Sequence, residues 1–240
     1  MECRCCGTPL ERPGDYCLVC RSDNADTVVL DCERERATVT ALLDDEVVSE
    51  RTVTTQLETD QRWAPTELRN YAGRIADEIR RKRPEEVYAT GDREVVRAVR
   101  ADVHYPFYRI ADDDPIEAVR RKRGEPSLEV VEASTEEKLG GSHSTLIGGR
   151  DGRKVIDTVA SHPHVKKIIP GPIDAGGSGS RTGVRAKATR ADDTGNVRLL
   201  IRDGSSVQEN RVVTTASDRE LGEYVRADLN DALVEAELKD

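Results

Sequence analysis

The sequence has few of the features that mark membrane or secreted proteins. Aromatic residues make up only 3% of its 240 residues, and there is a single methionine. No apolar run approaches the roughly 18 residues that a membrane-spanning helix needs. The first residues are charged and cysteine-rich, unlike the apolar core of a signal peptide. We therefore exclude a membrane-spanning helix and expect a cytoplasmic protein.

The sequence also lacks the motifs of common hydrolases. It contains no HExxH or ExxH pattern, and no Ser/His/Asp or Cys/His constellation can be read from it. His104 lies in an apolar stretch beside Tyr105, Phe107 and Tyr108, which favours a core or edge position over a catalytic one. These absences leave enzymatic activity open and favour a binding protein.

Lysine is scarce, and acidic residues are in excess. The chain has 8 lysines and 29 arginines, and with 46 acidic residues its net charge is −9. An acidic surface with few lysines and small apolar residues is typical of adaptation to high salt, where charge repulsion is screened. Against this background, an isolated Asp or Glu is a poor indicator of function.

Cysteine, by contrast, is concentrated at the N-terminus. Cys3, Cys6, Cys17 and Cys20 form two C-x2-C pairs separated by ten residues. This spacing is typical of a structural zinc site, because each pair can reach one metal ion from a tight turn. Gly7 directly follows the first pair and permits the left-handed backbone of such a turn. Disulfides are the weaker alternative, since nothing marks the chain for export.

Two further cysteines stand outside this pattern. Cys5 could replace Cys3, but Cys3 and Cys6 give the symmetric spacing, so we interpret Cys5 as a spare thiol. Cys32 lies in an apolar run, where a free cysteine behaves as a small hydrophobic residue. Spare thiols beside metal ligands require a reducing compartment.

The pattern of apolar residues predicts an α/β (α+β) protein in several parts. We expect a zinc ribbon or knuckle over 1–23, an α/β domain over 24–118, a linker over 119–142 and a small α+β domain over 143–240. The second part should contain strands at 27–31, 36–43, 47–55, 86–90 and 103–110, a helix between Pro65 and Pro84, and a helix after Asp92. This βββαβαβ order matches the core of ribonuclease-H-like folds.

Such a fold suggests a metal-dependent phosphodiesterase or nuclease as an alternative function. Its carboxylates would come from the first strand, the first helix and the end of the fourth strand, where two Mg²⁺ ions could drive hydrolysis. The candidates are Asp31, Glu33 and Asp92, with Glu67 or Glu78 from the helix. Because acids are so frequent, chance placement is the competing explanation, and Asp92 is equally a turn or N-cap residue.

The last part should contain two helices and four strands. We predict helices at 153–161 and from Ser217 to about Leu238, the latter with a capping box completed by Glu220. Strands are expected at 165–169, 184–190, 196–202 and 206–215, with a Gly/Ser loop over 171–183.

Several features of the sequence suggest nucleic acid, with RNA favoured, as a partner. The segment from Gly149 to Gly152 has the GxxG pattern by which KH domains hold a nucleic-acid backbone. Its candidate contacts are Gly149, Arg150, Gly152, Arg153 and Lys154, joined by Arg181 and Arg185 around the Gly/Ser loop. A plain glycine turn into a helix is the favoured alternative. Basic runs at 79–83 and 119–123 add positive charge, whereas the acidic net charge opposes strong non-specific binding.

Three histidines form a candidate second metal site. His162 and His164 share one face of an extended segment, and His143 could complete the set. The alternative is that they are ordinary polar residues at a helix-to-strand turn around Pro163.

The last domain resembles a known family. The residues that carry the resemblance are His143-Ser144-Thr145, Ile168–Ile173, Val207-Gln208-Glu209 and Val212–Thr215. Together they are similar to an uncharacterised archaeal and cyanobacterial family, usually labelled "predicted metal-binding protein". The resemblance covers about residues 143–222 and implies a small α/β domain without an established activity. With the composition, it suggests a halophilic archaeal source.

These observations lead to one main hypothesis and two alternatives. We expect a zinc-containing binding protein whose partner is nucleic acid or another protein. The alternatives are the phosphodiesterase that uses the carboxylates above and a purely structural protein.

Overall fold

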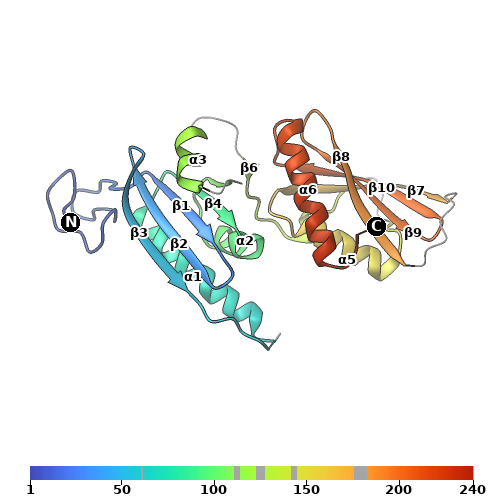
Figure 1. The fold of residues 1–240 in the computed structure, drawn as a ribbon, viewed down its shortest axis with the longest axis horizontal. Coiled ribbons are helices and arrows are strands. Elements are labelled where there is room, and N and C mark those ends of the chain that lie inside the picture. The colour runs from blue at the N-terminus through green and yellow to red at the C-terminus, as the bar shows by residue number, and fades with distance from the viewer. Residues whose placement is uncertain (61, 111–113, 123–127, 142–144, 176–182, 240) are drawn as a thin grey trace. The chain divides into compact units, whose positions relative to one another are not determined.

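A computed structural model describes the chain except for residues 61, 111–113, 123–127, 142–144, 176–182 and 240 (Figure 1). It divides into two compact units, Met1–Val130 and Val131–Asp240. Both units are mixed α+β structures. Among the described residues, no helix is long and apolar enough to cross a membrane.

The first unit is built on a six-stranded sheet in the order β3-β2-β1-β4-β5-β6. The strands are β1 (Thr27–Cys32), β2 (Arg36–Leu43), β3 (Glu46–Thr54), β4 (Glu86–Gly91), β5 (Phe107–Arg109) and β6 (Leu128–Glu129). Strands β1, β2 and β3 form an antiparallel meander, whereas β4 pairs parallel with β1 and with β5. Strand β6 is antiparallel to β5. The central position of β1 explains why its residues are so apolar.

Three helices pack on this sheet: α1 (Ala64–Lys82), α2 (Arg93–Asp102) and α3 (Pro115–Lys122). Helix α1 has a proline in its first turn and is followed by its C-cap, Arg83, which has a left-handed backbone conformation and precedes Pro84. Helix α2 begins after Asp92, whose carboxylate accepts the backbone N–H groups of Glu94 and Val95 at 2.9 and 3.0 Å. The boundaries of both helices therefore follow from local sequence signals.

The core of the first unit lies on both faces of the sheet. Val28, Leu30 and Cys32 of β1 pack with α1 and α2 on one face, whereas Val29 packs with α3 on the other. Because helices cover both faces of the sheet at β1, side chains on both sides of this strand are buried, and its sequence is a nearly continuous run of apolar residues.

The second unit contains an antiparallel sheet in the order β7-β10-β9-β8. Its strands are β7 (Val165–Ala175), β8 (Val184–Ala191), β9 (Val197–Asp203) and β10 (Ser206–Thr214), and its helices are α4 (Thr135–Lys138), α5 (Gly149–Ala160) and α6 (Arg219–Glu235). Helices α5 and α6 pack against one face of the sheet, as Figure 1 shows.

Buried polar side chains fix the helices of this unit to the sheet. Asn230 of α6 bonds both backbone groups of Ala188 in β8, donating to its oxygen at 2.9 Å and accepting from its nitrogen at 3.1 Å. The fully buried Lys138 donates to the carbonyl oxygen of Ala160 at 2.8 Å, at the C-terminal end of α5. A cation at this end is favourable because it satisfies unpaired carbonyl groups and complements the helix dipole.

Most predicted elements are present, with some differences in extent. The predicted linker, 119–142, instead contains the end of α3, strand β6 and helix α4 within its described part. The strand expected over 103–110 is reduced to three residues. The predicted cysteine module, 1–23, belongs to the same compact unit as the first sheet.

The start and end of the second unit's helices also differ from the prediction. Asp218, not Ser217, is the N-cap of α6, because its carboxylate accepts the N–H of Leu221 at 3.0 Å. Helix α5 starts at Gly149, four residues earlier than expected, and β7 runs on to Ala175. Part of the predicted Gly/Ser loop therefore belongs to a strand, and the part at 176–182 lies outside the described residues.

Candidate metal centre

Four cysteine thiols converge at the N-terminal end of the first unit. The sulfur atoms of Cys3, Cys6, Cys17 and Cys20 all lie within 4.8 Å of one another. Cys3 and Cys20 are 3.6 Å apart and Cys6 and Cys17 are 3.7 Å apart, and all four are free thiols. Four sulfurs placed about 2.3 Å from one zinc ion form a tetrahedron with edges of about 3.8 Å. The observed separations therefore fit a tetrahedral four-thiolate site.

The two cysteine pairs lie in two similar turns. In the first, the N–H of Cys3 donates to the oxygen of Thr8 at 2.8 Å, and in the second the N–H of Cys17 donates to the oxygen of Ser22 at 3.0 Å. The residue after each second cysteine has a positive φ, 71° at Gly7 and 59° at Arg21. The same left-handed turn thus presents both pairs of thiols, although only one of them uses glycine.

Hydroxyl groups at equivalent positions support the sulfurs. Thr8 Oγ1 lies 3.2 Å from Cys6 Sγ, and Ser22 Oγ lies 3.0 Å from Cys20 Sγ and 3.3 Å from Cys3 Sγ. The buried Asn24 accepts the N–H of Arg4 at 3.0 Å and donates to the carbonyl oxygen of Asp15 at 3.0 Å. Hydrogen bonds around the ligands orient them and stabilise their charge. Sequence reasoning identified the thiols but missed these supporting residues.

The surroundings shift the pKa values of the clustered thiols in different directions. Hydrogen bonds from the Ser22 hydroxyl and from backbone groups lower the pKa of Cys3 to about 5. The hydroxyl of Thr8 lowers the pKa of Cys6. Ser22 also acts to lower the pKa of Cys20, but burial and the neighbouring thiols raise it to about 12. Crowded thiolates repel one another, so the full set of four needs a cation at its centre.

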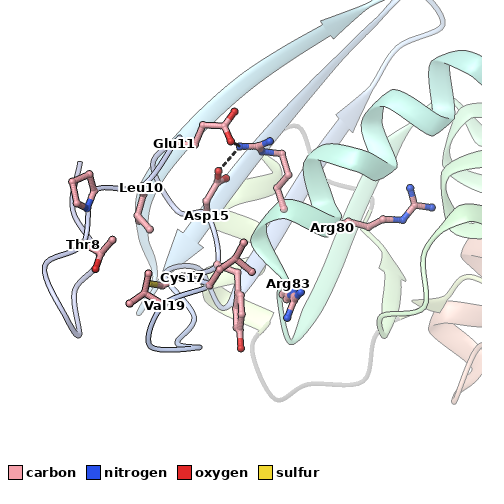
Figure 2. Close-up of a pocket in the computed structure, with 12 residues that line it drawn as sticks. Thr8, Leu10, Glu11, Asp15, Cys17, Val19, Arg80 and Arg83 are labelled. Carbon is pink, nitrogen blue, oxygen red and sulfur yellow. Dashed lines mark hydrogen bonds and ion pairs between the residues drawn. The ribbon is translucent and has the colours of Figure 1, made fainter.

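The cysteine module is joined to the C-terminal end of α1 by a buried ion pair. The fully buried Lys82 donates to the Asp15 carboxylate at 2.7 Å and to the carbonyl oxygen of Pro13 at 2.6 Å. Arg81 donates to the other carboxylate oxygen of Asp15 at 2.6 Å and pairs with Glu11 at 3.1 Å (Figure 2). The loop between the two cysteine pairs is therefore fixed to the helix by charged side chains.

Backbone and aromatic contacts reinforce this junction. The N–H of Tyr16 donates to the carbonyl oxygen of Arg81 at 2.9 Å, and the Arg83 guanidinium lies 4.1 Å from the centre of the Tyr16 ring. A hollow of about 310 Å³ lies between the module and the end of α1, with Leu18 and Val19 among its lining residues (Figure 2). Both of these side chains are largely exposed.

The other two cysteines stand apart from the cluster. Cys5 is exposed and only its backbone N–H contacts the site, donating to Cys3 Sγ at 3.4 Å. Cys32 is buried in the sheet, where desolvation and the nearby Asp31 and Asp92 carboxylates raise its pKa. The structure therefore selects Cys3 over Cys5 as the fourth ligand.

The carboxylates proposed for a nuclease do not form a comparable cluster. Within the described part of the chain, the cysteines are the only group in which three or more metal-ligating side chains converge. Asp31 is exposed on β1, and its neighbour Cys32 packs on the face that carries α1 and α2. Asp92 is committed to capping α2. The predicted set of Asp31, Glu33 and Asp92 is thus not among the groups whose ligand atoms converge in the described part of the chain.

The helix carboxylates also have structural partners. Glu67 accepts the hydroxyl of Thr55 at 2.7 Å and pairs with Arg34 at 3.2 Å. Glu78 pairs with Arg12 in the loop of the cysteine module. Both acids thus hold neighbouring segments on α1.

The histidines predicted for a second metal site are buried in the second unit. Nε2 of His162 lies 2.9 Å from an oxygen of Asp228 on α6, and its Nδ1 accepts the N–H of His164 at 3.3 Å. Because Nδ1 accepts, Nε2 carries the proton and donates to the carboxylate. Nδ1 of His164 lies 3.4 Å from the hydroxyl of Thr215. His162 therefore links α6 to the end of α5, and His143 lies outside the described residues.

The GxxG segment forms the first turn of α5, and the described residues 145–148 before it are not helical. Gly148 and Gly149 have positive φ values of 76° and 53°, and a side chain at Gly152 would collide with the carbonyl oxygen of Ile147 at 1.7 Å. These constraints explain the glycines as a tight entry into the helix. Arg150 is exposed, Arg153 pairs with Glu136 and Asp157 at 3.4 Å each, and Lys154 donates to the carbonyl oxygen of Ala236 at 3.4 Å.

The cysteine cluster and a match to a family model together support a metal-binding protein, built from two α+β units. Residues 134–231 match the family described as "Predicted metal-binding protein (DUF2103)", so the resemblance predicted for the last domain is confirmed. The matched segment lies within the second unit and contains none of the four clustered cysteines. Among curated proteins, no match to the sequence was found.

Proposed function

We propose that the four cysteines bind one structural zinc ion. The observation that carries this proposal is the convergence of four free thiols with separations of 3.6 and 3.7 Å between paired sulfurs. Four thiolates complete the coordination of zinc and leave no open position for water or substrate. The ion would stabilise the cysteine module against α1 and would not catalyse a reaction.

Elemental mass spectrometry of the purified full chain tests this proposal. We expect one zinc per chain, lost in a Cys3→Ser/Cys6→Ser variant and retained in a Cys5→Ser control. Absence of zinc from the wild-type protein would contradict the proposal. A metal retained by the double variant would indicate a different site, for which His143, His162 and His164 are the candidates.

We propose that the protein as a whole is a nucleic-acid-binding module with RNA as the favoured partner. Support comes from the second unit, where basic side chains gather on one sheet although the whole chain has a net charge of −9. A protein partner is the alternative, and it would be favoured by binding that does not depend on salt. The described cysteines are free thiols, which suits a reducing, cytoplasmic location.

We also propose that the first unit has a ribonuclease-H-like fold that serves as a scaffold. The support is its sheet order, with β1 between the antiparallel β2 and the parallel β4. Because the described carboxylates do not converge, we do not assign phosphodiester hydrolysis to this unit. Incubation of the protein with RNA and Mg²⁺ should leave the RNA intact, and cleavage that is lost in Asp92→Asn would contradict this assignment.

A further inference from the structure

One face of the second unit's sheet is open and strongly basic. Buried residues such as Ala188, Leu199 and Val212 point toward α5 and α6, and the residues that alternate with them are half-buried or exposed. The basic residues on this face are Arg185, Lys187, Arg198, Arg202 and Arg211, together with Arg190, which a register shift after Ala188 places opposite Arg198. Glu209 of β10 is an acidic residue on the same face. Among the described helices of this unit, α5 and α6 pack on the other face of the sheet, and α4 packs at its β7 edge.

Three of these arginines lie directly opposite one another across three strands. Arg190 of β8 pairs in register with Arg198 of β9, which pairs in register with Arg211 of β10. Arg185 and Arg202 form a second pair of direct neighbours between β8 and β9. Like charges at directly opposed positions destabilise a sheet. A row of arginines across strands therefore has an energetic cost that an anionic ligand would offset.

Acidic neighbours neutralise only part of this arginine row. Arg198 forms an ion pair with Glu209, and Arg211 lies 3.6 Å from an oxygen of Asp192. Asp192 also accepts the N–H groups of Thr194 and Asn196 at 3.0 and 2.9 Å, so its carboxylate is held by the β8–β9 turn. Among the described acidic side chains, none forms an ion pair with the exposed Arg190.

The arginine row also borders a hollow in the surface. Arg190, Arg198 and Arg211 line a depression of about 650 Å³, which Ile169 and Pro172 of β7 also line. Three carboxylates, those of Asp174, Asp192 and Glu209, share the same lining, so an anionic ligand would have to compete with them for the arginines. Neighbouring strands are about 4.8 Å apart, so the row spans roughly 10 Å. This length would allow contact with two successive phosphates of a nucleic-acid strand, and guanidinium groups bind phosphate oxygens well because of their planar set of donors.

The composition of this face indicates how a nucleic acid would be bound. Tyr224 on α6 is the sole Phe, Tyr or Trp residue between Val131 and Asp240, and the described histidines, His162 and His164, are buried. The described part of the sheet face therefore offers no ring on which a base could stack. Recognition of unpaired bases depends largely on such stacking, whereas duplexes are held mainly through their phosphates. The face thus suits the backbone of a duplex better than a single strand.

We propose that the arginine row Arg190–Arg198–Arg211 binds the phosphate backbone of a nucleic-acid duplex without reading its sequence. This assignment rests on the proposed nucleic-acid-binding function and names the surface that carries it. It places the binding surface on the sheet rather than on the GxxG turn at the start of α5. Arg185 and Arg202 extend the same surface along the strands.

Fluorescence anisotropy with a labelled 20-base-pair RNA duplex tests this proposal on the full chain. The test variant is Arg190→Gln/Arg211→Gln, and the matched control is Arg153→Gln/Lys154→Gln, which removes the same charge from α5. We expect the sheet variant to bind about 10- to 100-fold more weakly at 0.1 M salt and to reduce the slope of log K against log salt by about two. The α5 control should bind like the wild type, and a second duplex sequence should bind equally well.

The outcomes separate this inference from the broader function. Loss of binding in the α5 variant with normal binding by the sheet variant would overturn the assignment of the surface and leave nucleic-acid binding in place. No binding by the wild-type protein would overturn both. Thermal unfolding of the sheet variant without RNA supplies an independent readout, because removal of opposed like charges should leave its stability unchanged or increased. A marked loss of stability would show that these arginines are structural and would contradict the proposal.

Discussion

The ion pair between Asp15 and Lys82 should contribute a large part of the stability of the first unit. The Lys82 side chain is 1% exposed and that of Asp15 is 9% exposed, and their atoms are 2.7 Å apart. Removal of one partner from a buried pair typically costs about 3–5 kcal/mol, because the remaining charge is left without compensation. Asp15→Ala should therefore lower the free energy of unfolding by about this amount, which corresponds to a decrease in Tm of roughly 10–20 °C.

The variants around this pair make the prediction specific. Lys82→Met should lower the free energy of unfolding by less than Asp15→Ala does, because Asp15 still pairs with Arg81 at 2.6 Å. The double variant Asp15→Ala/Lys82→Met should be more stable than Asp15→Ala alone. Asp77→Ala is the matched control on the same helix. The Asp77 side chain is 72% exposed, so the loss of its ion pair with Arg80 should lower the free energy of unfolding by only about 0.5 kcal/mol.

Urea unfolding of the zinc-loaded chain, followed by fluorescence, measures these differences. The single tryptophan, Trp63, lies in the first unit and therefore reports on it. A cost below about 1 kcal/mol for Asp15→Ala, or strict additivity in the double variant, would refute the reasoning that this pair is buried and coupled.

Three further predictions concern the turns, the thiols and a helix cap. Gly7→Ala should weaken zinc binding by about 1–2 kcal/mol, because Gly7 has a φ of 71°, a backbone conformation that alanine adopts only with strain, even though no atom would collide with the added methyl group. Zinc-competition titrations measure this affinity, and an unchanged affinity would contradict the prediction. In the zinc-loaded native protein, iodoacetamide should label Cys5 alone. Removal of the metal with a chelator should allow labelling of the four clustered thiols as well, whereas Cys32 should stay unlabelled. Mass spectrometry counts the adducts, and rapid labelling of Cys32 would contradict its burial. The bond from the Leu221 N–H lowers the pKa of Asp218 in the folded state, so its stabilising effect is present above the unfolded pKa of about 4 and is lost as pH falls through the folded value. Asp218→Ala should therefore lower Tm at pH 7, with a difference from wild type that narrows below pH 4, and a difference independent of pH would contradict this role.

The sequence was most informative where structure depends on neighbouring residues. The C-x2-C spacing, the two prolines around α1 and the alternation in β8, β9 and β10 act locally, and the corresponding elements are present. Even the N-cap role considered for Asp92 could be anticipated, because Asp is a favoured cap before an apolar helix.

Features that depend on distant residues could not be anticipated. Lys82 and Asp15 are 67 positions apart, and an acidic residue in a chain with 46 of them gives no signal of a buried partner. The arginine row exists only because the strand registers place Arg190, Arg198 and Arg211 side by side. The positions of the candidate carboxylates also depend on how distant segments pack: Asp31 is exposed on β1, whereas Asp92 caps α2.

The measurement that tests the central claim most directly is X-ray absorption at the zinc edge of the purified protein. The account predicts a single shell of four sulfur atoms at about 2.3 Å from the metal. It also predicts that the spectrum is unchanged when His162 or His164 is replaced. A shell that contains nitrogen or oxygen at about 2.0 Å would contradict a four-cysteine centre and would place the metal at another site.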